Sequence, residues 1–386
     1  MLLKTRGTPH RIGGPIVAKL TRNRFADDPC KILIVEDGSI GESPDFKAVL
    51  TSAPVSQRID MPSVYSVGTF DHLAEDDIVV VNSDGSINTL YRTKSFQNFL
   101  LATERCNSNC LMCSQPPKDR DDTDYLYGVY SQLIPMIPKD CAELGITGGE
   151  PTLMGERFFS LLDMIKKELP ETEIHCLTNG RTFAWKNIAQ RLERVGLRRL
   201  MLGIPLYADH YQVHDYIVQA PHAFHQTIRG LYNLAAFDQR LEIRVVLHRQ
   251  SLPRLTRLAK FIFMNLPFVE HVAFMGLENQ GYTPHNIDKL WIDPADYMNE
   301  LGEAADFLSG HGINVSIYNS QLCLMPETLW KYNKRSISDW KNIYVAECVN
   351  CAMLERCGGL FASCANMHSQ HLKAFEQVEV KDLIVN

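Results

Sequence analysis

The chain has 386 residues, of which 45% are hydrophobic, and this is enough for two or three domains with a sizeable core. Its formal net charge is −6, whereas proteins that bind nucleic acids are typically basic, so no nucleic-acid partner is expected. No apolar run reaches the roughly 18 residues of a membrane span, and the first residues lack the apolar core of a signal peptide. We therefore expect a cytoplasmic protein without a membrane partner.

Residues 1–95 have the pattern of a small β-rich domain. Short β-like runs at 31–35 and 77–81 alternate with turn signals, and the turn at 82–86 is followed by a return strand at 87–91. We find no group of catalytic residues in the sequence of this region. We expect either a module that docks a peptide or partner, or a structural cap.

From about residue 97 the pattern changes to an alternation of strands and helices. Such alternating units build α/β folds, with a parallel sheet and helices outside it. The expected strands are 99–103, 142–147, 173–178, 199–204, 241–247 and 271–275, and the expected helices are 125–137, 157–169, 184–195, 223–236 and 255–264.

Three cysteines follow the first of these strands. Cys106, Cys110 and Cys113 have the spacing C-x3-C-x2-C. Three thiolates this close can hold three irons of a [4Fe–4S] cube and leave the fourth iron open, whereas ordinary electron-transfer clusters use four cysteines. Taken alone, the motif also fits a zinc knuckle or a disulfide fragment.

A second motif follows the second expected strand. Gly148, Gly149, Glu150 and Pro151 form a GGEP turn. Glycines let a backbone approach a ligand closely, and a carboxylate beside exposed carbonyl groups attracts an ammonium. Taken alone, GGEP is only a turn at the end of a strand.

Together the two motifs resemble the signature of the radical S-adenosylmethionine (radical SAM) superfamily. The resemblance implies a partial (β/α)6 TIM-like barrel at 96–285, a SAM-binding [4Fe–4S] cluster on the three cysteines, and a GGEP turn that binds the amino group of SAM. In that superfamily SAM is cleaved reductively, and the 5′-deoxyadenosyl radical removes a hydrogen atom from the substrate. The family usually has an aromatic residue where this chain has Met112.

Ligands of α/β barrels lie at the carboxyl ends of the strands. The resemblance therefore puts Cys106, Glu150, Asn179, Pro205 and Glu278 around one mouth. Asn179 is expected to contact polar groups of SAM, although a turn made with Gly180 explains it equally well.

Arg244 lies within the fifth expected strand, where a charged residue is unusual. We expect it to pair with the SAM carboxylate. An outward-facing ion pair is the alternative.

Five further cysteines lie in the C-terminal region at 286–386. Cys348, Cys351 and Cys357 have the spacing C-x2-C-x5-C, and Cys323 lies upstream. The pattern resembles the SPASM or Twitch extensions that bind auxiliary clusters. It implies one auxiliary [4Fe–4S] cluster, in which Cys323 and Cys364 compete for the last place. A structural zinc site with four thiolates is the alternative.

At finer scale, residues 106–122 and 215–220 are similar to the HxsC-type radical SAM maturases of the His-Xaa-Ser system. This likeness implies a peptide or protein substrate that carries His-Xaa-Ser repeats. It also implies a companion radical SAM maturase and an electron donor such as flavodoxin or ferredoxin. The alternatives are a radical SAM enzyme for a small molecule and a non-catalytic iron–sulfur or zinc scaffold.

Overall fold

The computed structural model describes residues 3–26, 28–36, 45–55, 60–335 and 341–376. These residues form two compact units. Unit 1 contains Met1–Thr103, Asp121–Thr147 and Met154–Ile174, and unit 2 contains Glu104–Arg120, Gly148–Leu153 and His175–Asn386. The predicted domain limits at residues 95 and 285 stay predictions.

The N-terminal region of unit 1 is β-rich, as the sequence predicts. Its sheet has the order β1-β8-β7-β3-β4-β5-β6-β2, with parallel pairing from β3 to β6 and antiparallel pairing elsewhere. The strands are β1 (Lys4–Arg6), β2 (Thr8–His10), β3 (Ile16–Thr21), β4 (Lys31–Val35), β5 (Ala48–Thr51), β6 (Ser63–Tyr65), β7 (Ile78–Val81) and β8 (Ser86–Tyr91).

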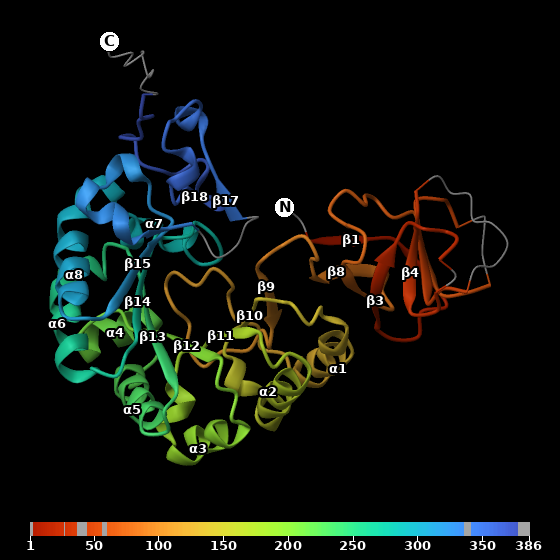
Figure 1. Cartoon of the computed structure of the whole chain (residues 1–386), viewed down its shortest axis with the longest axis horizontal. Helices are drawn as coiled ribbons and strands as arrows, with labels where there is room; N and C mark the ends of the chain where they lie inside the picture. The colour runs from red at the N-terminus through yellow and green to blue at the C-terminus, as the bar shows by residue number, and fades with distance from the viewer. Residues whose placement is uncertain (1–2, 27, 37–44, 56–59, 336–340, 377–386) are drawn as a thin grey trace, which may run out of the picture. The chain divides into compact units, whose positions relative to one another are not determined.

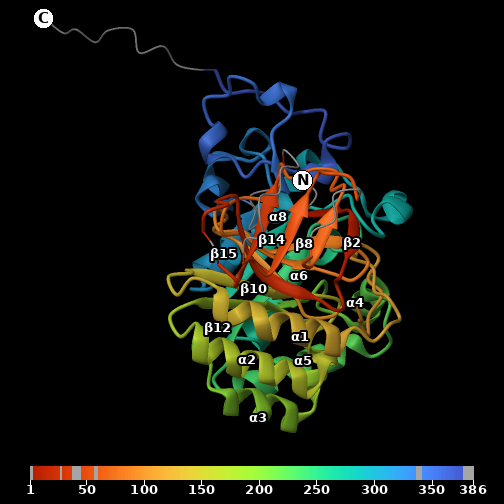
Figure 2. The same ribbon diagram turned by 90° about the vertical axis from the view of Figure 1, so that its right-hand side faces the viewer.

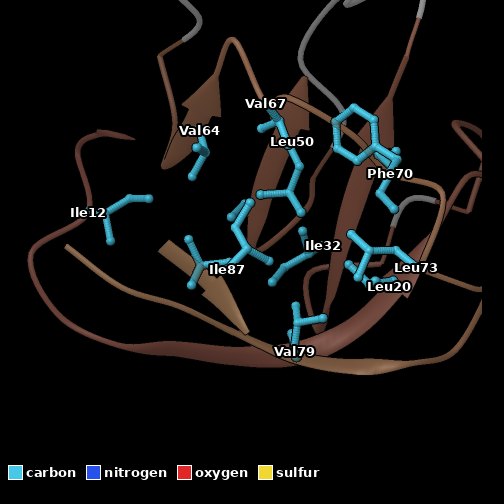
Figure 3. Close-up of a cluster of buried hydrophobic side chains, with 14 residues drawn as sticks. Ile12, Leu20, Ile32, Leu50, Val64, Val67, Phe70, Leu73, Val79 and Ile87 are labelled. Carbon is cyan, nitrogen blue, oxygen red and sulfur yellow. The ribbon is translucent and has the colours of Figure 1, made fainter. Parts of the chain in front are cut away.

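The predicted turn at 82–86 joins β7 to β8. Gly85 donates its backbone N–H to Asn82, and the carboxylate of Asp84 accepts from the backbone of Ser86. Branched apolar side chains from several strands meet on one face of the sheet, because successive residues of a strand point to opposite faces. Figure 3 shows this cluster, whose members include Leu20, Ile32, Leu50, Val79 and Ile87.

Unit 1 also holds the first strand–helix elements. Strands β9 (Asn98–Leu101) and β10 (Glu143–Thr147) pair in parallel. Helices α1 (Thr123–Leu133) and α2 (Glu156–Glu168) lie side by side in both views (Figures 1 and 2). Five apolar residues of α2 are buried at helical spacing: Phe158, Phe159, Leu161, Leu162 and Ile165.

Unit 2 continues the alternation and confirms the α/β class. Its strands occur in chain order, and those from β12 to β16 pair in parallel. They are the second part of β11 (Glu173–Leu177), β12 (Leu200–Pro205), β13 (Arg240–Val246), β14 (His271–Met275), β15 (Asn314–Tyr318) and β16 (Asn333–Lys334). All six predicted strands are therefore present. Closure into a partial barrel stays a prediction.

The helices of unit 2 are α3 (Lys186–Val195), α4 (Tyr211–Val218), α5 (Ala223–Ala235), α6 (Leu255–Asn265), α7 (Ile287–Leu290) and α8 (Met298–Gly310). Of these, α3, α5, α6 and α8 lie outside the strands (Figure 1). A further pair of short strands, β17 (Asn342–Ile343) and β18 (Leu360–Phe361), lies in the C-terminal region. Among the described residues, no helix combines the length and apolar character needed to cross a bilayer.

Strand β13 shows how the sheet separates two kinds of side chain. Leu241, Ile243 and Val245 alternate with Glu242 and Arg244, and all five are buried. Helix α5 contacts β13. The apolar residues Leu241, Ile243 and Val245 are of the kind that normally faces the helices covering a parallel sheet. Here the polar face is called the inner face.

Cys141 and Cys176 lie in apolar, strand-like runs of the sequence, which predicts core positions for both because free cysteine packs as a small hydrophobe. Cys176 on β11 is completely buried, as expected. Cys141 is only partly buried, with its sulfur 3.4 Å from the carbonyl oxygen of Glu143. The prediction is wrong for Cys141, because this residue precedes β10 instead of lying inside it.

Candidate functional site

The cysteine motif lies on a loop after β9 that is closed at its base. The backbone N–H of Lys118 donates to the carbonyl oxygen of Glu104 at 2.9 Å, and the Lys118 ammonium lies 2.6 Å from the Glu104 carboxylate. Arg120 also pairs with this carboxylate. These contacts join the two ends of the loop.

The end of helix α4 holds the middle of the loop. Asn109 and Leu111 donate their backbone N–H groups to the carbonyl oxygens of Val218 and Ile217, at 3.0 and 2.9 Å. Leu111 and Met112 are buried in an apolar cluster with both α4 residues. The cysteines are therefore carried by a loop whose backbone is fixed by the protein, and Met112 serves as packing.

A second segment, which sequence reasoning missed, holds the other side of the loop. Tyr282 donates its backbone N–H to the carbonyl oxygen of Cys113 at 2.9 Å. The amide of Asn286 donates to the carbonyl oxygen of Leu111 at 2.9 Å. These contacts join positions more than 150 residues apart, and neither residue belongs to a recognisable motif.

The three thiols influence one another. Burial, together with the neighbouring thiols of Cys113 and Cys106, raises the pKa of Cys110 to about 12. Burial also raises the pKa of Cys106, to about 11, and that of Cys113. Three partly buried thiolates therefore need positive charge beside them, and a bound metal centre supplies it because coordinating thiols lose their protons.

The GGEP turn touches the cysteine loop directly. Glu150 donates its backbone N–H to the carbonyl oxygen of Arg105 at 2.7 Å. A Cβ atom on Gly149 would lie only 2.1 Å from the same oxygen, so no side chain fits there. The two sequence motifs are thus held against each other by one backbone carbonyl group.

Glu150 is completely buried and accepts four hydrogen bonds. One oxygen accepts from the backbone and hydroxyl of Thr152, at 3.1 and 2.6 Å, and from the Thr178 hydroxyl at 2.7 Å. The other accepts from the backbone N–H of Asn179 at 2.7 Å. A carboxylate offers about four lone-pair positions, so Glu150 joins the turn to the end of β11.

Asn179 lies beside the first cysteine. Its side-chain amide donates to Asn107 at 2.6 Å and lies 3.9 Å from the Cys106 sulfur. Its carbonyl oxygen atom Oδ1 accepts from the backbone of Arg181, so it also makes the turn that the sequence allows. The two interpretations of this residue are therefore compatible.

Arg181 is a site residue that sequence reasoning missed. Its guanidinium donates to the Ser108 hydroxyl at 2.9 Å and to the Asn107 carbonyl group, and its Nε donates to the side-chain oxygen of Gln226 at 2.7 Å. Its charge lowers the pKa of Cys106 and Cys110, against the larger effect of burial. Nothing in the Asn-Gly-Arg sequence indicates this contact.

Arg244 lies on the inner face of the sheet. Its guanidinium is 2.6 Å from the carboxylate of Glu242, and both side chains are buried. An ion pair therefore exists, as the alternative interpretation held, but it does not face outward. Its contact with SAM stays a prediction.

A cavity of about 620 Å³ opens beside the first cysteine. Ligand pockets typically have about 300–1,000 Å³, so the volume suits a small molecule or part of a chain. Its lining includes Arg105, Cys106, Asn107, Lys118 and Asp119.

Four of the C-terminal cysteines lie on segments that are bonded to one another. Gln321 donates its side-chain N–H to the Gly359 carbonyl group at 2.7 Å, which joins the Cys323 segment to the Cys357 segment. Burial raises the pKa of Cys323, and Cys357 and Cys348 raise it further. Burial likewise raises the pKa of Cys348, with further contributions from Cys357 and Cys351.

Cys364 has a different environment. Its thiol donates to the carbonyl oxygen of Leu277 at 3.3 Å, in the segment after β14. Burial raises its pKa, and the charge of Glu278 raises it too. Glu278 itself pairs with Lys341 at 3.1 Å. Within the part of the chain that the structure describes, no other cysteine contributes to this change in the pKa of Cys364.

Both groups of cysteines, the one on the loop after β9 and the one in the C-terminal region, provide the thiolate ligands that iron–sulfur clusters use. Both sets consist of thiols, and the first has a guanidinium and a side-chain amide close to its sulfurs. Among the described residues, no three His, Cys, Asp or Glu side chains converge on one point as a single metal ion requires. A four-iron cube spreads its thiolates more widely than a single ion does.

Two buried histidines near the site should make stability pH-dependent. Burial lowers the pKa of His214 to about 4 and that of His248 to about 3, against about 6.5 in an unfolded chain. Both are neutral in the folded protein, so their contribution is complete above pH 6.5 and is lost as pH falls. When the pH falls from 7.5 to 5.5, each histidine should lower the free energy of unfolding by about 1–2 kcal/mol.

Urea unfolding at the two pH values measures this loss. The variant His214→Gln should remove about half of the pH dependence. Equal stability of the wild type at pH 7.5 and pH 5.5 would contradict the assignment.

Comparison with known proteins agrees with this geometry. Residues 100–262 match the family model of the radical SAM superfamily. The match covers the cysteine loop, the GGEP turn and the strands up to β13. Over this segment the chain is similar to the radical SAM superfamily.

The relatives are distant. An uncharacterized protein of Methanocaldococcus jannaschii (MJ0907) is 23% identical over 177 residues, which are 42% of this chain and 57% of that protein. The chain thus spans little more than half the length of this relative.

Two solved structures are similar in part. Streptococcus suis SuiB is 17% identical, with a TM-score of 0.47 over 62% of this chain and 53% of that chain. Native anSMEcpe with bound AdoMet is 16% identical, with a TM-score of 0.42 over 56% and 63%.

Proposed function

We propose that this protein is a radical SAM enzyme that modifies a peptide or protein. Cys106, Cys110 and Cys113 hold a [4Fe–4S] cluster, and one iron has no protein ligand. When bound, this cluster supplies the electron that cleaves SAM to methionine and a 5′-deoxyadenosyl radical. The observation that carries the proposal is the contact of Gly149 and Glu150 with Arg105, because it joins the two motifs at one point.

The chain's own residues prepare the site in three ways. Leu111 and Met112 bury one side of the cysteine loop and exclude water there. Arg181 supplies positive charge to thiols whose ionisation burial disfavours. The Asn179 amide, 3.9 Å from the Cys106 sulfur, is a donor of the kind that tunes cluster potentials.

The glycines of the GGEP turn provide the cofactor contact in this proposal. Glu150 fixes the turn through its four internal hydrogen bonds, so the carbonyl groups of Gly148 and Gly149 keep one orientation. Fixed carbonyl groups suit the ammonium of SAM because they need no reorganisation when it binds.

A protein with His-Xaa-Ser repeats is the proposed substrate. The support is the sequence likeness of residues 106–122 and 215–220 to the maturases of that system. The second of these segments contains Ile217 and Val218, which accept hydrogen bonds from the cysteine loop. The proposal includes a companion maturase and a flavodoxin or ferredoxin as electron donor.

Formation of 5′-deoxyadenosine tests the proposal. Protein reconstituted without oxygen is mixed with dithionite and SAM, with and without a His-Xaa-Ser repeat peptide. We expect cleavage of SAM that the peptide stimulates. Stimulation by a small molecule alone would favour the alternative that the cavity of about 620 Å³ supports. No cleavage by fully loaded protein would favour a scaffold.

An auxiliary [4Fe–4S] cluster in the C-terminal region completes the proposal. Its ligands are Cys323, Cys348, Cys351 and Cys357, whose segments are bonded together, and Cys364 is left free. One backbone N–H group supports this set, since Phe375 donates to the Cys351 sulfur at 3.4 Å. A zinc site on the same four thiols is the alternative.

Iron analysis of two single variants separates Cys323 from Cys364. Cys323→Ala should lower the iron content from about eight to about four atoms per chain, because a cluster that loses one of four thiolates is not retained. Cys364→Ala should keep all of the iron. The reverse pattern would make Cys364 the ligand, and zinc in the wild type would exclude the auxiliary cluster.

A further inference from the structure

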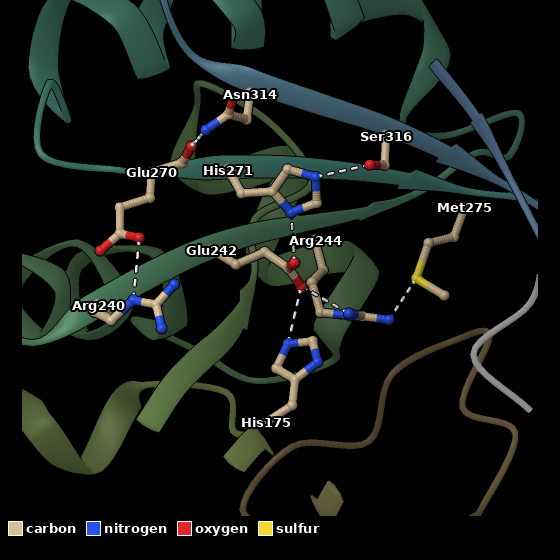
Figure 4. Close-up of polar contacts among 9 residues, drawn as sticks. All are labelled: His175, Arg240, Glu242, Arg244, Glu270, His271, Met275, Asn314 and Ser316. Carbon is tan, nitrogen blue, oxygen red and sulfur yellow. Dashed lines mark hydrogen bonds and ion pairs between the residues drawn. The ribbon is translucent and has the colours of Figure 1, made fainter. Parts of the chain in front are cut away.

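Four strands place polar side chains together on the inner face of the sheet. They are His175 on β11, Glu242 on β13, His271 on β14 and Ser316 on β15 (Figure 4). The interiors of parallel α/β barrels are normally filled by branched apolar residues. A charged group in such a place is costly unless hydrogen bonds satisfy it, so this cluster calls for a physical reason.

Glu242 is the centre of the cluster and only 4% of it is exposed. One carboxylate oxygen is 2.6 Å from His271 Nδ1, and the other is 2.6 Å from Arg244 and 3.2 Å from His175 Nε2. Burial alone would raise the pKa of Glu242, but the two histidines and Arg244 hold it well below its usual range. Glu242 is therefore ionised and fixed from three sides.

The far side of His271 is also fixed. Its Nε2 lies 2.9 Å from the hydroxyl oxygen of Ser316. Because Nδ1 faces a carboxylate, it carries the proton, and Nε2 accepts from the hydroxyl. The orientation of Glu242 is thus set by residues of β11, β14 and β15.

Arg244 is held on one side only. Its Nη1 bonds to Glu242 and its Nη2 lies 2.9 Å from the Met275 sulfur, which is a weak acceptor. Among the described residues these are the two hydrogen-bond partners of its guanidinium, which carries five N–H donors. Its side chain is only 9% exposed. A buried guanidinium with unmatched donors is complementary to an anion.

Arg244 and the cysteine loop both lie near Tyr207, which is buried in one cluster with Leu111 and Met112 of that loop. Met275, beside Nη2, is the last residue of β14. Burial raises the pKa of the Tyr207 phenol, the thiols of Cys110 and Cys113 raise it further, and the charge of Arg244 lowers it. Gly203 makes room for this arrangement, since a Cβ atom there would lie 2.9 Å from Arg244 Cδ.

We infer that Glu242 is a positioning residue, which holds Arg244 so that its free donors bind the carboxylate of SAM. The inference rests on the proposed function. A carboxylate matches the two-pronged geometry of a guanidinium, and charge-assisted hydrogen bonds of this kind are among the strongest in proteins. Glu242 acts only through Arg244, and this gives the inference its test.

The test compares the binding of SAM and decarboxylated SAM to the reconstituted protein by anaerobic equilibrium dialysis. The ratio of the two dissociation constants measures the preference for the carboxylate. Arg244→Gln and Glu242→Gln should each reduce this preference about tenfold or more. Arg240→Gln is the matched control, because Arg240 lies on the same strand and pairs with the partly exposed Glu270. It should leave the preference unchanged.

The double variant separates positioning from general damage. If Glu242 acts through Arg244, Glu242→Gln has no further effect when Arg244 is already glutamine. Glu242→Gln alone leaves a buried charge without its partner and can prevent folding, whereas the double variant removes both charges of the pair. The effect of Glu242→Gln can therefore still be measured by comparing the double variant with Arg244→Gln. Iron content and circular dichroism check that each variant is loaded and folded.

The outcomes distinguish the inference from the proposed function. Wild-type protein that binds no SAM would overturn the proposed function itself. Wild-type protein that binds SAM, with a preference that Arg244→Gln does not change, would overturn the inference alone. If Glu242→Gln lowers the preference for the carboxylate as much in the Arg244→Gln variant as in the wild type, the positioning role is overturned.

Discussion

Replacing Cys106, Cys110 and Cys113 together with alanine is expected to abolish the formation of 5′-deoxyadenosine. The three thiols are the protein ligands of the proposed cluster, and their loop is held by α4 and by residues 282–286 without it. The variant should therefore fold and should keep the auxiliary iron. Anaerobic assay with dithionite and SAM measures the product, and iron analysis should show a loss of about four atoms per chain.

Cys30→Ala is the matched control, since Cys30 is an exposed free cysteine outside both cysteine groups. It should retain full activity and iron. Activity in the triple variant would contradict the proposed site. Loss of activity in the Cys30 variant would point to general sensitivity of the protein to cysteine replacement.

The second large effect is expected at Glu150. The variant Glu150→Gln puts an amide N–H₂ against the donors of Thr152, Thr178 and Asn179, so at least one buried donor loses its acceptor. Each unsatisfied buried group costs about 1–3 kcal/mol. We expect the free energy of unfolding to fall by about 3 kcal/mol, and the formation of 5′-deoxyadenosine to fall because the GGEP turn is no longer fixed.

Urea unfolding and the SAM cleavage assay measure the two effects of this variant. Glu193→Ala is the control, because Glu193 is an exposed residue of helix α3, and exposed substitutions usually change stability by less than about 0.5 kcal/mol. Unchanged stability of Glu150→Gln would show that the four hydrogen bonds do not hold the turn.

The strands could be predicted because they are buried apolar runs bounded by turn signals. β13 and β14 are examples, and both begin within one residue of their predicted positions. The predicted helices at 157–169 and 223–236 also correspond to α2 and α5. Local periodicity decides these elements, so the sequence is sufficient for them.

Helix α4 could not be predicted in the same way. It has eight residues, and its buried positions are His214, Ile217 and Val218. A helix this short shows little periodicity, and its stability comes from tertiary packing. Its packing on Leu111 and Met112 of the cysteine loop is a contact between distant parts of the chain.

The candidate site shows the same division between local pattern and tertiary contact. The cysteines and the GGEP turn carry chemistry in their spacing, and so the sequence indicates them. Arg181, Tyr282 and Asn286 reach the cysteine loop only through the fold. Arg244 is visible in the sequence as a charge within a strand, but its ion pair with Glu242 depends on which face of β13 is covered by helices.

One spectroscopic measurement tests the central claim most directly. The variant Cys348→Ala/Cys351→Ala, reconstituted without oxygen and reduced, should retain a single [4Fe–4S] cluster on the first cysteine group. Its electron paramagnetic resonance spectrum should change when SAM is added, because SAM then binds the iron that the protein leaves free. An unchanged spectrum from a fully loaded cluster, or zinc in place of iron, would contradict the account.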